Sequence, residues 1–109
     1  MLIDFQGLEE KIINNFYGGE KSTVAHLFID EKNKIMLGKL EPGASIGLHT
    51  HQTSSEILYV LQGEGQVLYD GTSERINKGS CHYCPKGHEH SLINDSNADL
   101  LFFAVVPEQ

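Results

Sequence analysis

The sequence contains no tryptophan, only two cysteines, and only eight lysine and arginine residues against fifteen aspartate and glutamate residues. The basic residues are spread along the chain and the formal net charge is −7, so the basic patch that nucleic acid or an anionic membrane requires is missing. The longest apolar run, residues 100–106, is far shorter than the roughly 20 residues of a membrane span. The N-terminus lacks the cationic and apolar regions of a secretory signal. We therefore expect a cytoplasmic protein that binds neither nucleic acid nor membranes.

The length of 109 residues suits one hydrophobic core and is too short for two. A hydrophobic fraction of 39% and a charged fraction of 21% are typical of a globular protein. We find no internal repeat and no linker. The sequence therefore predicts a single domain over residues 1–109.

Short runs of β-branched and aromatic residues alternate with turns rich in glycine, asparagine and aspartate. The runs with strand length are 23–29, 34–40, 56–61, 65–69 and 100–106. Many short strands at near-regular spacing predict an all-β sandwich or barrel. Residues 8–16 are the one segment with helical spacing, because Leu8, Ile12, Ile13 and Phe16 would share a face, and they allow one short N-terminal helix at most.

Residues 79–90 contain two cysteines and three histidines, which raises the possibility of a zinc site. If residues 80–85 form a strand, Cys81 and Cys84 point to opposite faces about 10 Å apart. They could then neither share an ion nor form a disulfide, which needs Cα atoms within about 7 Å. We therefore interpret the cysteine pair as structural. The single histidines His26, His82 and His88 are expected to be structural or surface residues.

The stronger metal signal lies upstream, at His49, His51 and Glu56. On a strand, His49 and His51 project from one face with Cα atoms about 6.6 Å apart, close enough to bind one ion. Glu56 begins an apolar strand, where a carboxylate is costly to bury without a positive partner. A metal ion held by the two imidazoles would be such a partner.

These residues belong to two motifs through which the chain resembles the cupins, a family of small β-barrels. The first motif of that family is Gly, five residues, His-x-His, three or four residues, Glu, six residues, Gly. The second is Gly, five residues, Pro-x-Gly, two residues, His, three residues, Asn. All ten positions are matched, by Gly43, His49, His51, Glu56, Gly63, Gly79, Pro85, Gly87, His90 and Asn94.

The resemblance implies a double-stranded β-helix, or jelly-roll barrel, whose motif-bearing core covers roughly residues 35–106. It also implies that His49, His51, Glu56 and His90 bind one divalent transition metal, and that Asn94 supports a loop. An octahedral ion with these four ligands keeps two positions open, which suits iron, manganese, nickel or copper; zinc would favour a closed tetrahedral site. Glu56 could also detach and act as a catalytic general base.

Two classes of function follow from the resemblance. The first is a metal-dependent enzyme acting on a small oxygen-rich organic molecule, dioxygenase-like or alternatively an isomerase, lyase or decarboxylase. The second is a non-catalytic module that binds a metal or a small ligand. The strand parity of Leu58, Val60 and Leu92 predicts mostly apolar surroundings for the metal. We also expect a homodimer in which residues 22–29 pair with an edge strand of a second subunit.

Overall fold

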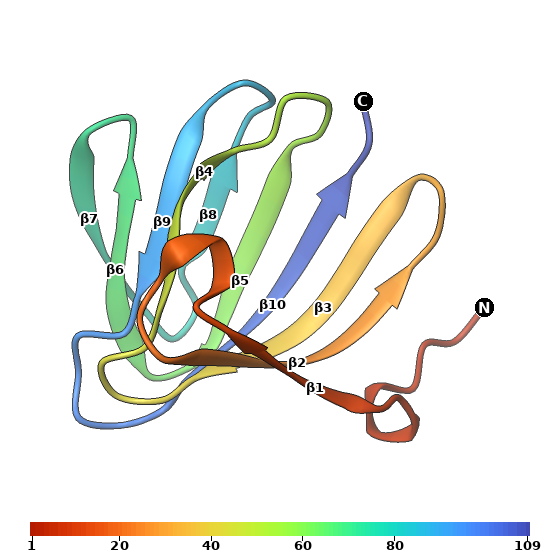
Figure 1. Cartoon of the computed structure of the whole chain (residues 1–109), viewed down its shortest axis with the longest axis horizontal. Helices are drawn as coiled ribbons and strands as arrows, with labels where there is room; N and C mark the ends of the chain where they lie inside the picture. The colour runs from red at the N-terminus through yellow and green to blue at the C-terminus, as the bar shows by residue number, and fades with distance from the viewer.

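The computed structural model describes all 109 residues, and it consists of two antiparallel sheets that face each other (Figure 1). The larger sheet has the strand order β1-β2-β3-β10-β5-β8 and the smaller one the order β4-β9-β6-β7. The strands are β1 (Glu10–Asn14), β2 (Ser22–Ile29), β3 (Asn33–Leu40), β4 (Ser45–Thr50), β5 (Glu56–Gln62), β6 (Glu64–Tyr69), β7 (Thr72–Asn77), β8 (Cys81–Cys84), β9 (Glu89–Ile93) and β10 (Leu100–Pro107). This arrangement confirms the predicted all-β jelly roll.

The core lies between the two sheets and follows the alternation of each strand. In β5, Leu58 and Val60 are buried, whereas the intervening Ile57 and Tyr59 face outward. Thirteen buried apolar side chains form one cluster: Ala25, Met36, Leu40, Ala44, Ile46, Leu58, Val60, Val67, Ile76, Leu92, Leu100, Phe102 and Ala104. Both sheets contribute to it, so each strand of the sandwich is oriented by the side chains that it buries.

The expected helix over residues 8–16 is wrong. Residues 10–14 form the edge strand β1, which pairs with β2 so that Ile12 faces Val24. The only helical segments are two 3-10 turns, η1 (Phe5–Gly7) and η2 (Phe16–Gly18), and neither has the length or the apolar character to cross a membrane. Ile12 and Ile13 are β-branched, and pairing with β2 satisfies backbone groups that an isolated short helix would satisfy poorly.

The expected route to a dimer is wrong for residues 22–26 of β2, because this part of the strand has no free edge. It pairs with β1 on one side and with β3 on the other. The edges of the larger sheet are β1 and β8. Residues 22–26 are therefore not available to pair with an edge strand of a second subunit.

Asn94 supports the loop between β9 and β10, as expected. Its side chain is fully buried, and its amide donates to the carbonyl oxygens of Leu40 and Ala98, both at 2.8 Å. Its Oδ1 accepts from the backbone and the hydroxyl of Ser96. The side chain thus replaces the backbone partners that this turn cannot provide for itself.

The N-terminal segment packs against β4 through two glycines. A Cβ on Gly19 would lie 2.0 Å from the carbonyl oxygen of Ser45, and one on Gly47 would lie 2.1 Å from the carbonyl oxygen of Tyr17. Neither contact is possible for a larger residue without moving the backbone. This close approach brings η2 beside β4, at the mouth of the barrel (Figure 1).

We expect Gly47→Ala to lower the free energy of unfolding by about 1–3 kcal/mol, because the new methyl group forces the two segments apart. Gly7→Ala is the control, since a Cβ there would meet only the flexible end of the Asp4 side chain, at 3.3 Å. Urea denaturation measures both variants. Equal stability of the two would show that the approach of η2 to β4 is not as tight as described.

Candidate metal centre

The structure brings together the four side chains that the sequence singled out. His49 lies near the end of β4, His51 directly follows that strand, Glu56 begins β5 and His90 lies on β9. Residues 49 and 90 face each other in the β4–β9 register, after a bulge between Ile46 and His49. One ligand atom from each of the four side chains lies within 4.8 Å of the others.

The distances among these atoms test whether a metal ion fits. Glu56 Oε1 lies 2.9 Å from His51 Nε2 and 3.1 Å from His90 Nε2, and His49 Nε2 lies 3.1 Å from Nε2 of both His51 and His90. The distance between His49 Nε2 and Glu56 Oε1 is longer, 3.9 Å. With bonds of about 2.1 Å, neighbouring ligands of an octahedral ion are about 3.0 Å apart and opposite ones about 4.2 Å, whereas all tetrahedral pairs are about 3.4 Å apart. These distances would therefore suit an octahedral divalent ion held by the four residues better than a tetrahedral one.

The cluster is buried, with the four side chains between 4% and 12% exposed. Burial alone would raise the pKa of the Glu56 carboxyl, but the imidazoles of His49, His51 and His90 around it outweigh burial and hold that pKa well below its usual range. The carboxylate is therefore ionised at neutral pH, as binding to a cation requires.

Two hydrogen bonds orient the imidazoles toward the centre of the cluster. His49 Nδ1 donates to the carbonyl oxygen of Gly47 at 2.7 Å, which leaves the lone pair on Nε2. His90 Nδ1 lies 3.0 Å from Nε2 of His82. Burial and the neighbouring His90 lower the pKa of His82, so His82 stays neutral and can accept this hydrogen bond. Metal-binding histidines are commonly held in this way by a partner on the other ring nitrogen.

The sequence did not reveal two residues of the site. His82 lies opposite Leu58 in the β5–β8 register. The alternation of side chains along β8, which turns His82 inward, was the signal that could have placed it in the site. Tyr17 of η2 stacks on the His49 ring, with centroids 3.9 Å apart and planes at 9°. Tyr17 comes from the N-terminal third, outside both motifs, and no spacing in the sequence connects it to β4.

The Cys-x-x-Cys pair forms no site of its own, as expected. Both cysteines are free thiols, with Cys81 exposed and Cys84 buried on opposite faces of β8. The Cys84 sulfur does lie near His82 and His90. Burial and the nearby charges of Glu56 and Asp70 raise its pKa to about 11, so it remains a thiol at neutral pH rather than a thiolate ligand.

The remaining histidines have other partners. His88 contacts Asp70 and the hydroxyl of Tyr69 at the surface, and His26 Nδ1 lies 3.1 Å from the carbonyl oxygen of Leu8. Of the cluster at residues 79–90, His90 alone belongs to the group around Glu56, and His82 reaches that group through His90.

An apolar cavity of about 260 Å³ opens onto His51 and Glu56. Its walls come from β1, η2, β2, β3 and β10; the eleven lining residues are Ile13, Phe16, Tyr17, Leu27, Ile29, Lys34, Met36, His51, Glu56, Ala104 and Val106. Apolar surroundings were expected, but Leu58, Val60 and Leu92 do not supply them, because these three are packed in the core.

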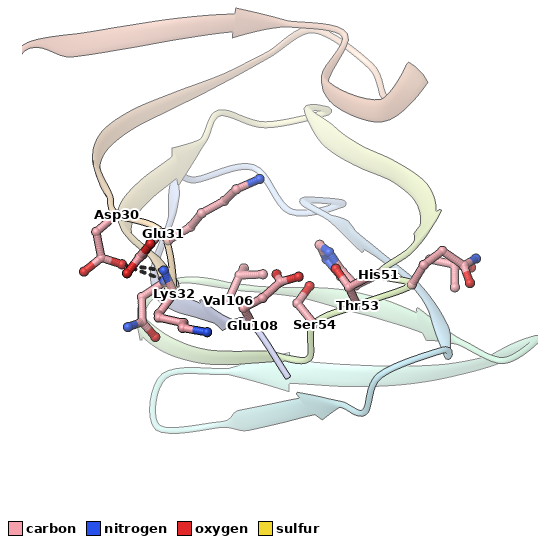
Figure 2. A pocket seen from close by; sticks show the side chains of 12 residues that line it. Asp30, Glu31, Lys32, His51, Thr53, Ser54, Val106 and Glu108 are labelled. Carbon is pink, nitrogen blue, oxygen red and sulfur yellow. Dashed lines mark hydrogen bonds between the residues drawn. The ribbon is translucent and has the colours of Figure 1, made fainter.

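A second cavity, of about 290 Å³, is polar and adjoins the first. Figure 2 shows Asp30, Glu31 and Lys32 on one side of it and His51 and Thr53 on the other. The two cavities share Lys34, His51 and Val106. The centre thus has an apolar side and a polar side.

The family model of the cupin domain matches residues 36–106. The chain belongs to the cupin family. The oxalate-binding protein of Thermotoga maritima is 37% identical over 112 aligned positions, which cover 97% of this cupin and 93% of that protein. An uncharacterised protein of Methanocaldococcus jannaschii is 29% identical over 93 residues, covering 85% of this chain and 66% of the other.

Solved structures agree with this assignment. The crystal structure of a predicted oxalate decarboxylase from Thermotoga maritima matches with a TM-score of 0.93 and 30% identity, over 100% of both chains. The cupin domain of Cnp3 from Schizosaccharomyces pombe matches with a TM-score of 0.81 at 13% identity, over 100% of this chain and 74% of the other. The second match supports the fold alone.

We expect the metal-free protein to lose stability as the pH falls below the ordinary range of a glutamate. Because the folded pKa of Glu56 lies below its unfolded value, its contribution is complete above the unfolded value of 4.5 and is lost as the pH falls through the folded value. The free energy of unfolding, measured by urea between pH 3 and pH 6, should therefore rise with pH. Glu56→Gln should flatten that slope, and an unchanged slope in this variant would assign it to other carboxylates.

Proposed function

We propose that this cupin binds one divalent transition metal through His49, His51, Glu56 and His90, and binds a small oxygen-rich organic anion at the two remaining positions. The convergence of these four ligand atoms carries the proposal, and their short distances with one longer distance suit an octahedral ion better than a tetrahedral one. Iron, manganese, nickel and copper suit such a site better than zinc.

The charge of the site favours an anionic ligand. Three neutral imidazoles and one carboxylate leave a divalent ion with a net charge of +1. When bound, the ion supplies Lewis-acid chemistry toward two ligand oxygens. The similarity to a protein named for oxalate binding supports this ligand class, since oxalate presents two adjacent oxygens to one ion.

The protein's own residues shape the rest of the site. Leu27, Met36 and Ala104 form an apolar wall that excludes water beside the centre. The stacked ring of Tyr17 restricts rotation of His49, and His82 fixes the ring of His90. These contacts keep the ligand atoms converged before any ligand enters.

Catalysis is the second candidate function, and one observation favours it. The Glu56 carboxylate lines the apolar cavity, so a ligand held there would lie within reach of a group that can accept a proton. A dioxygenase-like reaction and a decarboxylation both suit a small chelating substrate in this setting. Binding without turnover suits the same geometry, and the distinction rests on product formation.

We expect protein purified without added metal to contain close to one equivalent of iron, manganese, nickel or copper by mass spectrometry. The double variant His49→Ala/His51→Ala should lose it, whereas His26→Ala, a histidine remote from the centre, should keep it. Oxalate binding measured by calorimetry should disappear with the metal. Metal retained by the double variant would mean that the ligand set is wrong.

Turnover separates the two candidate functions in the same preparations. Oxygen consumption with β-diketones, catechols and hydroxy acids, or carbon dioxide release from oxalate, would assign an enzyme. Tight ligand binding without either product would assign a binding module.

We also propose a homodimer that forms through the outer face of the larger sheet. Ile12, Ile57, Tyr59, Leu61 and Tyr83 are between 39% and 64% exposed on this face. No acidic residue interrupts this face on β5 and β8 after Glu56, although the chain as a whole carries a net charge of −7. An apolar sheet face of this kind is typical of a contact with a second copy.

We expect light scattering to give about twice the chain mass of 12.1 kDa at micromolar concentration. Tyr59→Asp should give the monomer mass, because a charge at the centre of the apolar face cannot be buried without a partner. Asn97→Asp, which adds the same charge on an exposed loop, should remain dimeric. A wild-type mass near 12 kDa would rule out the dimer.

A further inference from the structure

Lys34 is the one positively charged side chain that lines the apolar cavity beside Glu56. It lies on the same face of β3 as the buried Met36, two residues before it. Its register partners are Ile29 on β2 and Val106 on β10, and both line the same cavity. The side chain of Lys34 is exposed, and it lines both this apolar cavity and the polar one.

The ammonium group of Lys34 has no carboxylate partner in the chain. Two other basic residues do have such partners, since Lys21 lies 3.9 Å from Glu41 and Arg75 pairs with Asp95. Lys34 also lines the polar cavity, together with Asp30, Glu31 and Glu108, but it forms an ion pair with none of these carboxylates. A cation without a counter-ion beside an apolar pocket is favourably placed to receive an anionic group of a ligand.

The lining of the apolar cavity thus combines three kinds of side chain. His51 and Glu56 belong to the centre, Lys34 carries a positive charge, and most of the other residues are apolar. A sphere with the cavity volume of 260 Å³ is about 8 Å across, below the range of drug-sized sites. Oxalate has its two carboxylates bonded directly to each other, so it would leave most of this length empty.

We propose that Lys34 determines ligand specificity by binding the distal carboxylate of a four- or five-carbon dicarboxylate whose other end carries a neighbouring hydroxyl or oxo oxygen. The chelating end would occupy the open positions of the centre, and the short methylene segment would contact the apolar wall. This inference rests on the proposed function, because it requires a ligand held at the metal. It goes further by naming the residue that recognises the far end of that ligand.

Three probes separate the two ends of the ligand. Malate has a hydroxy-acid end and a distal carboxylate, 2-hydroxybutyrate has the same end and the same number of carbons with a methyl group instead, and oxalate has only the chelating end. Calorimetry with the Mn(II)-loaded protein measures each dissociation constant. We expect Lys34→Met to weaken malate binding about tenfold or more and to change the other two by about twofold at most.

Matched variants test whether the effect belongs to this position and this charge. Lys34→Arg, which keeps the charge, should stay within about threefold of wild type for malate, and Lys34→Gln should reproduce Lys34→Met. Lys32→Met removes a charge that lines only the polar cavity and should leave malate binding unchanged. Metal content should be the same in all variants.

The outcomes distinguish this inference from the proposal on which it rests. Normal malate affinity in Lys34→Met, an equal loss for all three probes, or an equal loss in Lys32→Met would overturn the role of Lys34 and leave the chelating site intact. Failure of the metal-loaded wild type to bind any of the three probes would overturn both.

Discussion

The burial of the Glu56 carboxylate at the edge of an apolar core is the constraint on which the centre depends. An ionised carboxylate without a partner would cost several kcal/mol at this depth, yet its pKa lies below the usual range. Three imidazoles compensate, and they can do so only because β4 pairs with β9 and aligns residue 49 with residue 90. The compensation of the Glu56 charge therefore depends on the sheet register. A slip of one residue in the β4–β9 pairing would turn His90 outward and leave Glu56 with a buried, poorly compensated charge.

The N-terminal segment supplies contacts to the centre that the motif-bearing part of the barrel does not provide. The approach of Gly19 and Gly47 lets η2 reach β4, and it is this approach that brings Tyr17 over His49. Tyr17 adopts a left-handed backbone conformation, with φ of 52°, which a tyrosine takes only when its surroundings hold it there. The same segment and β1 supply one wall of the apolar cavity. A part of the chain without any motif residue thus lines the cavity that opens onto the centre.

The sequence was informative where local rules apply and uninformative where distant segments meet. The alternation of side chains along a strand correctly predicted that Leu58 and Val60 face inward, and motif spacing singled out the four side chains that converge. The helix over residues 8–16 was wrong because apolar residues at helical spacing also fit an edge strand whose two faces are both partly apolar, with Ile13 toward the cavity and Ile12 toward solvent. Strand β7 was missed because five of its six residues are exposed and only Ile76 is buried. Tyr17 and Lys34 could not be assigned at all, because their roles depend on the packing of β1, η2 and β3 around the mouth of the barrel.

The attraction of an anionic ligand depends on where the positive charges of this acidic chain are placed. A chain with a net charge of −7 repels anions over its whole surface, so attraction of an anionic ligand must come from groups inside the site. A metal-loaded centre would carry a net charge of +1, Lys34 lines the same cavity, and a dianion that contacted both would neutralise both charges. A monoanion bound at the centre would leave Lys34 without a counter-ion, while a neutral chelator would leave both charges uncompensated. The proposed preference for a dianion therefore depends on two positive charges that the folded barrel brings to one largely apolar cavity, and on no single motif.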